Sequence, residues 1–226
     1  MKKFILALLV MVSATEAHAA PNFLKRMFQD IKLPSQQVLE KDVFSSPLAQ
    51  DTARILSHVA GPTSAAAAAV TTFSNQPDMA RNLIVTAEIN GPAADLGNCL
   101  VNVAGTDIRG RNISENFDVR AATFSAVTGN FAFKTVTSVN FPLSCEAGGF
   151  SVKWNIGIGV KLGLKSCQNG SGDLAWTSTG GIYDATRATV ATGGSTSVQG
   201  STISFNLAPN GVSVYNAYYV NNFRCP

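Results

Sequence analysis

A change of hydrophobic period near Asn82 constrains the fold of this chain more than any other feature. From there onward apolar residues recur at every second position, first in "NLIVTAEI" and later along the longest apolar run. In that longer run one face carries Val152, Trp154, Ile156, Ile158 and Val160. A period of two is typical of β-strands, and short strands separated by turns such as "TGG" and "PNG" are typical of all-β domains. The sequence therefore predicts a mainly β protein, with an antiparallel β-sandwich or barrel-like domain over residues 77–226.

Three stretches within this region predict particular features of the sheet. The apolar-rich runs Cys99–Ala104 and Ile113–Val119 flank the turn-forming "GTDIRGR", a pattern typical of a hairpin. The stretch "FAFKTVTSVNF" is rich in β-branched and aromatic residues and predicts another strand. Gly157 and Gly159 interrupt the long apolar run, which indicates a twist, a bulge or a close backbone approach there.

The first third of the chain predicts two further segments. Residues 1–20, "MKKFILALLVMVSATEAHAA", have a basic start, an apolar stretch and a small-x-small site, as in a secretory signal peptide. Met27 would also make a natural start for a soluble chain, so the fate of residues 1–20 stays open. Residues 21–76 combine helical spacings of apolar residues with the alanine-rich "GPTSAAAAAVTTF", and they predict a helical or extended arm with a linker. We expect residues 21–60 of this arm to contact neighbouring subunits.

The cysteines leave two interpretations open. Their spacings match no CxxC-type metal or redox motif. In an exported protein they would pair in one of three connectivities, whereas in a protein assembled in the cytoplasm they would be small buried hydrophobic residues. The four residues are Cys99, Cys145, Cys167 and Cys225.

The chain offers no evident arrangement of catalytic groups. Both histidines, His18 and His58, fall outside the predicted β-rich part, which leaves its hydroxyls without a histidine base. Asp107 is expected to make turn hydrogen bonds, and Asp184 is expected to pair with Arg187 across a turn. The carboxylates considered for a catalytic pair are Asp95, Asp107, Glu115, Asp118, Glu146, Asp173 and Asp184. Phosphate-binding, dinucleotide-binding, zinc-protease and serine-hydrolase motifs do not occur, so we predict no catalytic, cofactor-binding or metal-binding residue and no enzyme.

Charge and aromatic content bear on the partners of the protein. Charged residues make up 14% of the chain, and only nine of them lie from Ala121 onward. The net charge of +3 is scattered without a basic run, so we expect no nucleic-acid partner. Such a surface suits packing against neighbouring subunits, and it also fits an ordinary Ser/Thr-rich β protein. We interpret Tyr215, Tyr218 and Tyr219, on the expected last strand, as structural anchors, with a sugar-binding platform as the alternative.

Several stretches, taken in order, resemble a β-rich domain of tailed-bacteriophage virion proteins. "QPDMARNLIVTAEI" resembles its opening, with Pro77, Arg81 and Asn82 on a Pro-x-x-x-Arg-Asn segment. "FAFKTVTSV" and "IGIGVKLGL" resemble a later strand and the glycine-containing segment after it, and "DATRATV" and "APNGVSVYNAYYV" resemble the closing hairpin. Between these lies a hairpin with a Gly-Thr-Asp-x-x-Gly turn and a Ser/Thr-Glu pair, matched by Gly105, Thr106, Asp107, Gly110, Ser114 and Glu115.

This resemblance covers residues 77–220 and rests on the order and spacing of the stretches. It implies a non-enzymatic structural component of a bacteriophage virion, most simply a capsid decoration or cement protein. It also implies a homotrimer that binds the major capsid protein at the capsid surface, without a cofactor. The signal-like start and the four cysteines depart from the family. Two alternatives therefore stay open, a tail or baseplate structural protein and an exported bacterial surface or adhesin-type protein, periplasmic or extracellular. A membrane partner is expected only if residues 1–20 act as a signal.

Overall fold

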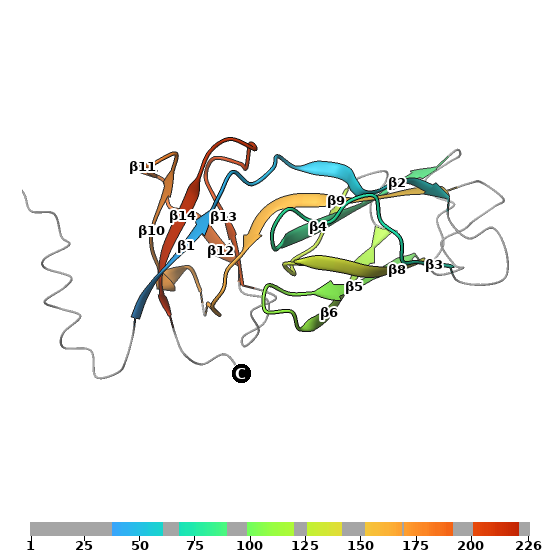
Figure 1. Cartoon of the computed structure of the whole chain (residues 1–226), viewed down its shortest axis with the longest axis horizontal. Coiled ribbons are helices and arrows are strands. Elements are labelled where there is room, and N and C mark those ends of the chain that lie inside the picture. Colours follow the sequence, from blue (N-terminus) through green and yellow to red (C-terminus); the bar gives the residue numbers. More distant parts are fainter. Residues whose placement is uncertain are drawn as a thin grey trace, which may run out of the picture. The chain divides into compact units, whose positions relative to one another are not determined.

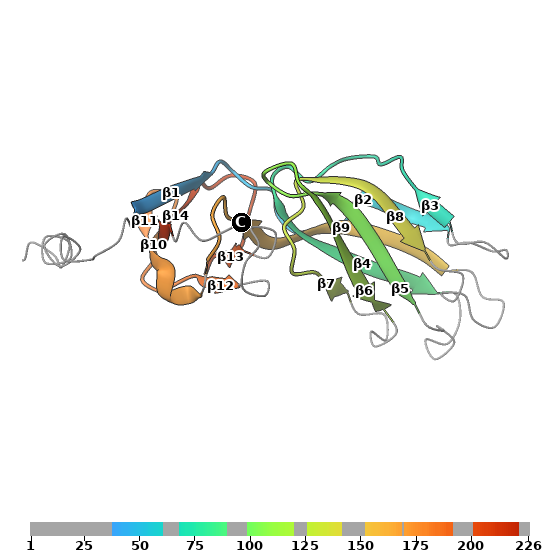
Figure 2. The same ribbon diagram turned by 90° about the horizontal axis from the view of Figure 1, so that it is seen from below.

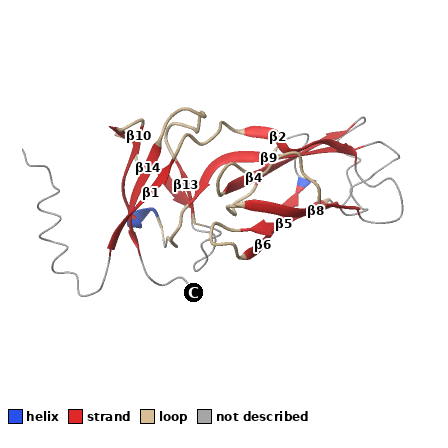
Figure 3. Ribbon diagram, viewed as in Figure 1, coloured by secondary structure: helices blue, strands red, loops and turns tan. Residues whose placement is uncertain are grey.

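Strands make up nearly all of the regular structure in the part of the chain that can be described. The computed structural model describes residues 38–60, 68–89, 99–119, 126–141, 152–168, 170–191 and 201–221. The strands are β1 (Val38–Phe44), β2 (Asp51–Ala60), β3 (Ala68–Val70), β4 (Arg81–Ile89), β5 (Leu100–Thr106), β6 (Asn112–Asp118), β7 (Val127–Thr128), β8 (Thr135–Phe141), β9 (Val152–Gly163), β10 (Leu174–Thr179), β11 (Ile182–Tyr183), β12 (Thr189–Ala191), β13 (Thr202–Ser204) and β14 (Tyr215–Asn221). A short 3-10 helix, η4 (Ser171–Asp173), precedes β10, and Figure 3 shows how strands dominate the ribbon. The predicted mainly β fold class is confirmed.

The strands form three antiparallel sheets (Figure 1). One sheet has the order β1-β14-β10-β11, and we call it the terminal sheet. A second has the order β12-β13-β9-β4-β7, with β2 also paired to β9. The third has the order β3-β8-β5-β6. Strand β9 is the longest of the fourteen, and it joins β2, β4 and β13 in one sheet.

The larger hydrophobic core lies between the β2-β9-β4 layer and the β8-β5-β6 layer (Figure 2). Alternation of side chains on β9 produces one wall of this core, where Val152, Trp154, Ile156 and Ile158 are all buried, as predicted. The ring of Trp154 stacks on Phe141 of the opposite layer, with ring centroids 5.2 Å apart. Such a pair contributes packing across the two layers beyond its buried area.

A second core lies where the terminal sheet meets β12, β13 and the end of β9. Tyr215, Ala217 and Tyr219 on β14 alternate inward, and Leu162 of β9 packs in the same cluster. Strand β9 therefore serves the larger core with its first part and the second core with its last residues. The transition between the two occurs at Gly159 to Lys161, where the pairing with β4 changes register.

Of the helical or extended arm predicted over residues 21–76, the described part is extended, and its strands belong to the sheets instead of forming a separate arm. Strand β1 pairs with β14 over its whole length, and β2 pairs with β9. Long-range pairing decides this conformation, because the local helical spacing of apolar residues is a weak signal that tertiary contacts override. Among the described residues the first strand is β1, and both β1 and β2 pair within their own chain. Residues 1–20 and 21–37 lie outside the described residues, and the expected inter-subunit role of residues 21–60 stays a prediction.

The predicted hairpin is confirmed, with β5 and β6 paired antiparallel across the "GTDIRGR" turn. The strand predicted from "FAFKTVTSVNF" begins only at Thr135, because the residues before it form a bridge to Arg81 instead of a regular ladder. His58 lies on β2, so the expectation that both histidines fall outside the β-rich part is wrong for this one. Its ring lies 3.3 Å from Glu88, and both side chains are largely exposed.

Candidate functional site

Arg81, at the start of β4, is a fully buried charge that ties three segments together. Its Nε donates to the carbonyl oxygen of Gly159 at 2.8 Å, and Nη2 donates to the same oxygen. Nη1 donates to the carbonyl oxygen of Leu48 at 3.0 Å and to Asp78 Oδ1 at 2.9 Å. Burial lowers the pKa of Arg81, and the Asp78 carboxylate opposes that shift, so the guanidinium stays charged. The side chain acts as a buried hydrogen-bonded connector.

Asn82, the next residue, holds the register change in β9. Its Nδ2 donates to the carbonyl oxygen of Gly129 at 3.2 Å, and its Oδ1 accepts the backbone N–H of Lys161 at 2.9 Å. A Cβ atom at Gly159 would overlap the Asn82 side-chain amide, so only glycine fits there. The predicted irregularity is therefore present at Gly159, where Arg81 and Asn82 fix it from β4, while Gly157 pairs regularly with Ile84 and gives the close approach of the Asp51 and Thr52 backbone.

The hairpin turn depends on the buried carboxylate of Asp107. Its Oδ1 accepts the backbone N–H groups of Arg109 at 2.8 Å and Arg111 at 2.9 Å, and Oδ2 accepts Nε of Arg111 at 2.9 Å. Gly110 has a φ of 78°, in the left-handed region that favours glycine. The prediction that Asp107 makes turn hydrogen bonds is confirmed, and its oxygens are occupied by the turn itself.

Glu115, on β6, fastens the segment that leads into β8. Its carboxylate accepts the backbone N–H of Asn130 at 2.6 Å and that of Phe131 at 3.2 Å. Lys161 of β9 donates to the side-chain oxygen of Asn130 at 3.0 Å. Burial raises the pKa of Glu115, while the two backbone hydrogen bonds act in the opposite direction. This carboxylate therefore holds a loop between two sheets.

The "FAFKTVTSV" stretch is joined to the same network through its backbone. Phe133 and Arg81 exchange two backbone hydrogen bonds of 2.9 and 3.1 Å, and the N–H of Lys134 donates to the carbonyl oxygen of Thr106 at 2.7 Å. The hydroxyl groups of Thr106 and Thr135 hydrogen-bond at 2.6 Å. Three of the stretches that carry the resemblance, those beginning at Gln76, Phe131 and Ile156, are thus joined around Arg81 and Asn82 in a group of contacts that we call the β4–β9 junction.

Three of the carboxylates considered for catalysis, Asp107, Glu115 and Asp184, each have separate partners among the described residues. Asp184 Oδ2 accepts the hydroxyl of Thr179 at 3.3 Å, and Arg187 donates to the carbonyl oxygen of Leu174. The predicted Asp184–Arg187 pair is therefore wrong, because each side chain has a different partner. Asp95 and Glu146 lie outside the described residues. Among the residues that the structure describes, no group of three His, Cys, Asp or Glu side chains could hold a metal ion.

Two of the three tyrosines on β14 are buried anchors of the second core. The hydroxyl of Tyr215 donates to the carbonyl oxygen of Ala208 at 2.7 Å, and that of Tyr219 donates to Asp42 Oδ2 at 2.7 Å. Burial and the Asp42 carboxylate raise the pKa of Tyr219. The ring of Tyr218 is half-buried, stacks on Trp176 with centroids 4.5 Å apart, and has Lys41 Nζ 5.2 Å from its centre.

Sequence reasoning missed Asp42, a buried carboxylate that also lies 3.3 Å from Lys165 Nζ and accepts the N–H of Lys165 at 3.0 Å. It missed this residue because β1 was assigned to the arm.

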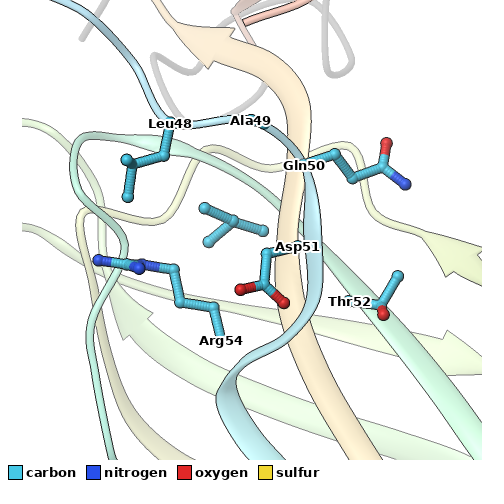
Figure 4. Close-up of a pocket in the computed structure, with 7 residues that line it drawn as sticks. Leu48, Ala49, Gln50, Asp51, Thr52 and Arg54 are labelled. Carbon is cyan, nitrogen blue, oxygen red and sulfur yellow. The ribbon is translucent and has the colours of Figure 1, made fainter. Parts of the chain in front are cut away.

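A hollow of about 540 Å³ lies where the β1–β2 connection and the start of β2 cross β9 (Figure 4). Its lining consists of Leu48, Ala49, Gln50, Asp51, Thr52, Arg54 and Ile158. The side chains of Leu48, Asp51 and Arg54 lie on one side of the chain, and those of Gln50 and Thr52 point to the other (Figure 4). This hollow was also missed from the sequence, because six of its residues belong to the segment interpreted as an arm.

Both described cysteines, Cys99 and Cys167, are in disulfide bonds. The interpretation of these two as buried thiols is therefore wrong. Cys145 and Cys225 lie outside the described residues. Disulfides persist in oxidising surroundings, which include the bacterial periplasm and the surfaces of cells and virions.

Comparison with known proteins adds no relative: no family model, curated protein or solved structure matches the chain. Within the residues described, no helix has the length and apolar character needed to cross a membrane.

Proposed function

We propose that this protein is a non-enzymatic structural component of a bacteriophage virion, most simply a capsid decoration or cement protein. The observation that carries the proposal is the β4–β9 junction. The stretches that resemble the virion domain are distant in sequence, yet Arg81, Asn82, Gly159 and Lys161 contact one another there. Their polar groups are occupied by backbone partners, as expected of residues that maintain a fold. The resemblance is thereby explained as a set of folding determinants.

The distribution of exposed apolar side chains supports an assembly role. Eight large hydrophobic side chains of the described residues are exposed, and all except Leu100 belong to β1, β11 or the segment between β13 and β14. The other seven are Leu39, Val43, Ile182, Tyr183, Leu207, Val212 and Val214. They lie on the terminal sheet or on the segment leading into it. β1 and β11 are the two edges of that sheet, and exposed apolar groups at sheet edges offer contact surfaces to neighbouring chains. Copies of the chain itself, as a homotrimer, and the major capsid protein are the partners that this role requires.

Imaging of purified particles tests the proposal. We expect mass spectrometry of phage particles from the source culture to contain this chain. Cryo-electron microscopy should then show a protrusion at the capsid surface into which residues 38–221 fit. Density for the chain on the tail or baseplate would instead support a tail or baseplate structural protein. Absence of the chain from purified particles, with recovery from the culture medium or envelope fraction, would contradict a virion role.

An exported bacterial surface or adhesin-type protein is the second candidate, and the disulfides of Cys99 and Cys167 favour it. Together with the signal-like residues 1–20, they fit a chain that matures in an oxidising compartment. Mass spectrometry of the intact protein from cell fractions separates the candidates. A mature start after Ala19 with oxidised cysteines in the periplasm or medium would support export.

A further inference from the structure

Arg54, on β2, has a buried hydrogen-bond donor without an acceptor. Its side chain lines the hollow of Figure 4, and its Nε is inaccessible to solvent with no hydrogen-bond partner among the described residues. A guanidinium carries five N–H donors and a permanent charge, and an unpaired buried donor is costly. The charge of Arg54 also acts on Arg81, whose pKa it helps to lower after the larger effect of burial. Nε is closed to a ligand, but the outer N–H groups of the same guanidinium are not among the buried atoms and make no hydrogen bond to the described residues, so they are open to an acceptor.

The neighbouring carboxylates do not supply the missing acceptor. Asp78 uses Oδ1 for Nη1 of Arg81 and Oδ2 for the backbone N–H of Leu48, both at 2.9 Å. Asp51 accepts a backbone N–H of its own turn at 2.9 Å through Oδ1. In Figure 4 the Asp51 carboxylate lies beside the base of the Arg54 side chain, whereas the guanidinium extends away from it towards Leu48. An acceptor from outside the chain would meet the guanidinium at its free end.

We propose that this hollow binds a carboxylate group carried on a short apolar stem. The guanidinium of Arg54 holds the carboxylate, since planar, paired N–H donors match a carboxylate in two parallel hydrogen bonds. Leu48 lines the hollow and contacts the stem, whereas the side chain of Ile158 lies fully buried beneath the lining. A singly charged anion fits better than a phosphate, because the Asp51 carboxylate on the rim repels a second negative charge. The carboxylate comes either from a free carboxylic acid or from an acidic side chain of another polypeptide.

Nuclear magnetic resonance of the full chain, with labelled Leu and Ile methyl groups and arginine Nε, tests the proposal. The probes are propionate and its neutral analogue propionamide. We expect propionate to shift the signals of Leu48, Ile158 and Arg54 Nε–H saturably, with a dissociation constant on the order of millimolar. Propionamide should bind at least roughly tenfold more weakly, because the charge-assisted hydrogen bonds are lost. No saturable shift, or equal binding of both probes, would overturn the proposal.

Two variants sharpen the measurement. Arg54→Gln should lose propionate binding, and Lys153→Gln should retain it, because Lys153 is an exposed residue of β9 outside the lining and controls for net charge. Undiminished binding by Arg54→Gln would refute the role of the guanidinium. If Arg54→Gln does not fold, the comparison of propionate with propionamide on the unmodified chain still tests the proposal.

A second titration, with a peptide, distinguishes the two sources of the carboxylate. The peptide acetyl-Ala-Glu-Ala-amide is titrated beside propionate, with the corresponding Gln peptide as its neutral control. Tighter binding of the Glu peptide than of propionate assigns the site to an acidic side chain of a partner polypeptide. Propionate that binds at least as tightly as the peptide assigns it to a free acid. Failure of both ligands overturns the proposal, and it leaves the virion role untouched because that role does not depend on this hollow.

Discussion

Replacement of Arg81 by methionine should remove a large part of the free energy of unfolding. Methionine retains most of the apolar stem but none of the donors that serve Gly159, Leu48 and Asp78. Loss of one partner from a buried charged pair costs about 3–5 kcal/mol, because the other charge and the carbonyl groups stay desolvated. Since domains are stable by only about 5–15 kcal/mol, this single change should bring the fold close to its threshold.

Equilibrium unfolding in urea, with the disulfides intact, measures this loss. Arg109→Met serves as the matched control, because Arg109 is exposed and makes one side-chain hydrogen bond, to the carbonyl oxygen of Lys165. The control should change the free energy of unfolding by no more than about 0.5 kcal/mol. Asp78→Asn should cost less than Arg81→Met, since Asp78 is 15% exposed and water replaces part of its interaction. The double variant should be less destabilised than the sum of the two by about 1 kcal/mol or more.

The reasoning depends on the charge and its partners acting as one unit. A loss below about 1 kcal/mol for Arg81→Met would refute it, because that is the size of an ordinary substitution. Strict additivity of Arg81→Met and Asp78→Asn would refute the coupling separately. In that case the guanidinium would stabilise the fold only through its packing.

Three further predictions follow from the same contacts. Gly159→Ala should destabilise the protein by about 1–3 kcal/mol in urea unfolding, because its Cβ has no room, while Gly172→Ala, in open space, should be nearly neutral. Because burial raises the pKa of Glu115 above 4.5, its contribution to stability is complete below that pH and is lost as pH rises through the folded value. The unmodified chain should therefore lose stability relative to Glu115→Gln as the pH rises above 4.5, and an opposite trend in urea midpoints would contradict this. Peptide mapping without reduction should show a disulfide between Cys99 and Cys145. Cys99 directly precedes β5, and Cys145 shortly follows β8 in the sequence, the antiparallel neighbour of β5. A bond from Cys99 to any other cysteine would refute this pairing.

Local patterns predicted the strands whose alternation coincides with burial. The run in β9 carried a clear signal, because four alternate residues from Val152 to Ile158 face the larger core. Strand β1 carried a misleading one. Its apolar residues Leu39 and Val43 are exposed while Asp42 is buried, so the pattern of burial contradicts the pattern of hydrophobicity. Only the pairing of β1 with β14 accounts for that inversion, and long-range pairing is invisible to a local reading.

The sequence alone predicted some contacts of the site and not others. What separates the two groups is how far apart the partners lie along the chain. Asp107 was predicted correctly because a turn aspartate bonds to backbone groups within a few residues of itself. Arg81, Asn82 and Glu115 were recognised only as members of a series, since their partners lie elsewhere in the chain. The hollow at Arg54 could not be predicted at all, because it depends on how β2 crosses β9.

The β4–β9 junction also limits which conclusions about partners can be drawn from the resemblance. The residues that compose it are buried or bonded to backbone groups, so substitution there would alter the fold before it altered any partner. Exposed positions such as Val43, Ile182 and Val212 are free of that constraint, so substitutions there would change a contact surface without cost to the core. Chains that share the junction would therefore share a β fold while packing against different neighbours. The choice between head, tail and cell surface must accordingly be decided at the terminal sheet and the segment leading into it, where the exposed apolar side chains lie.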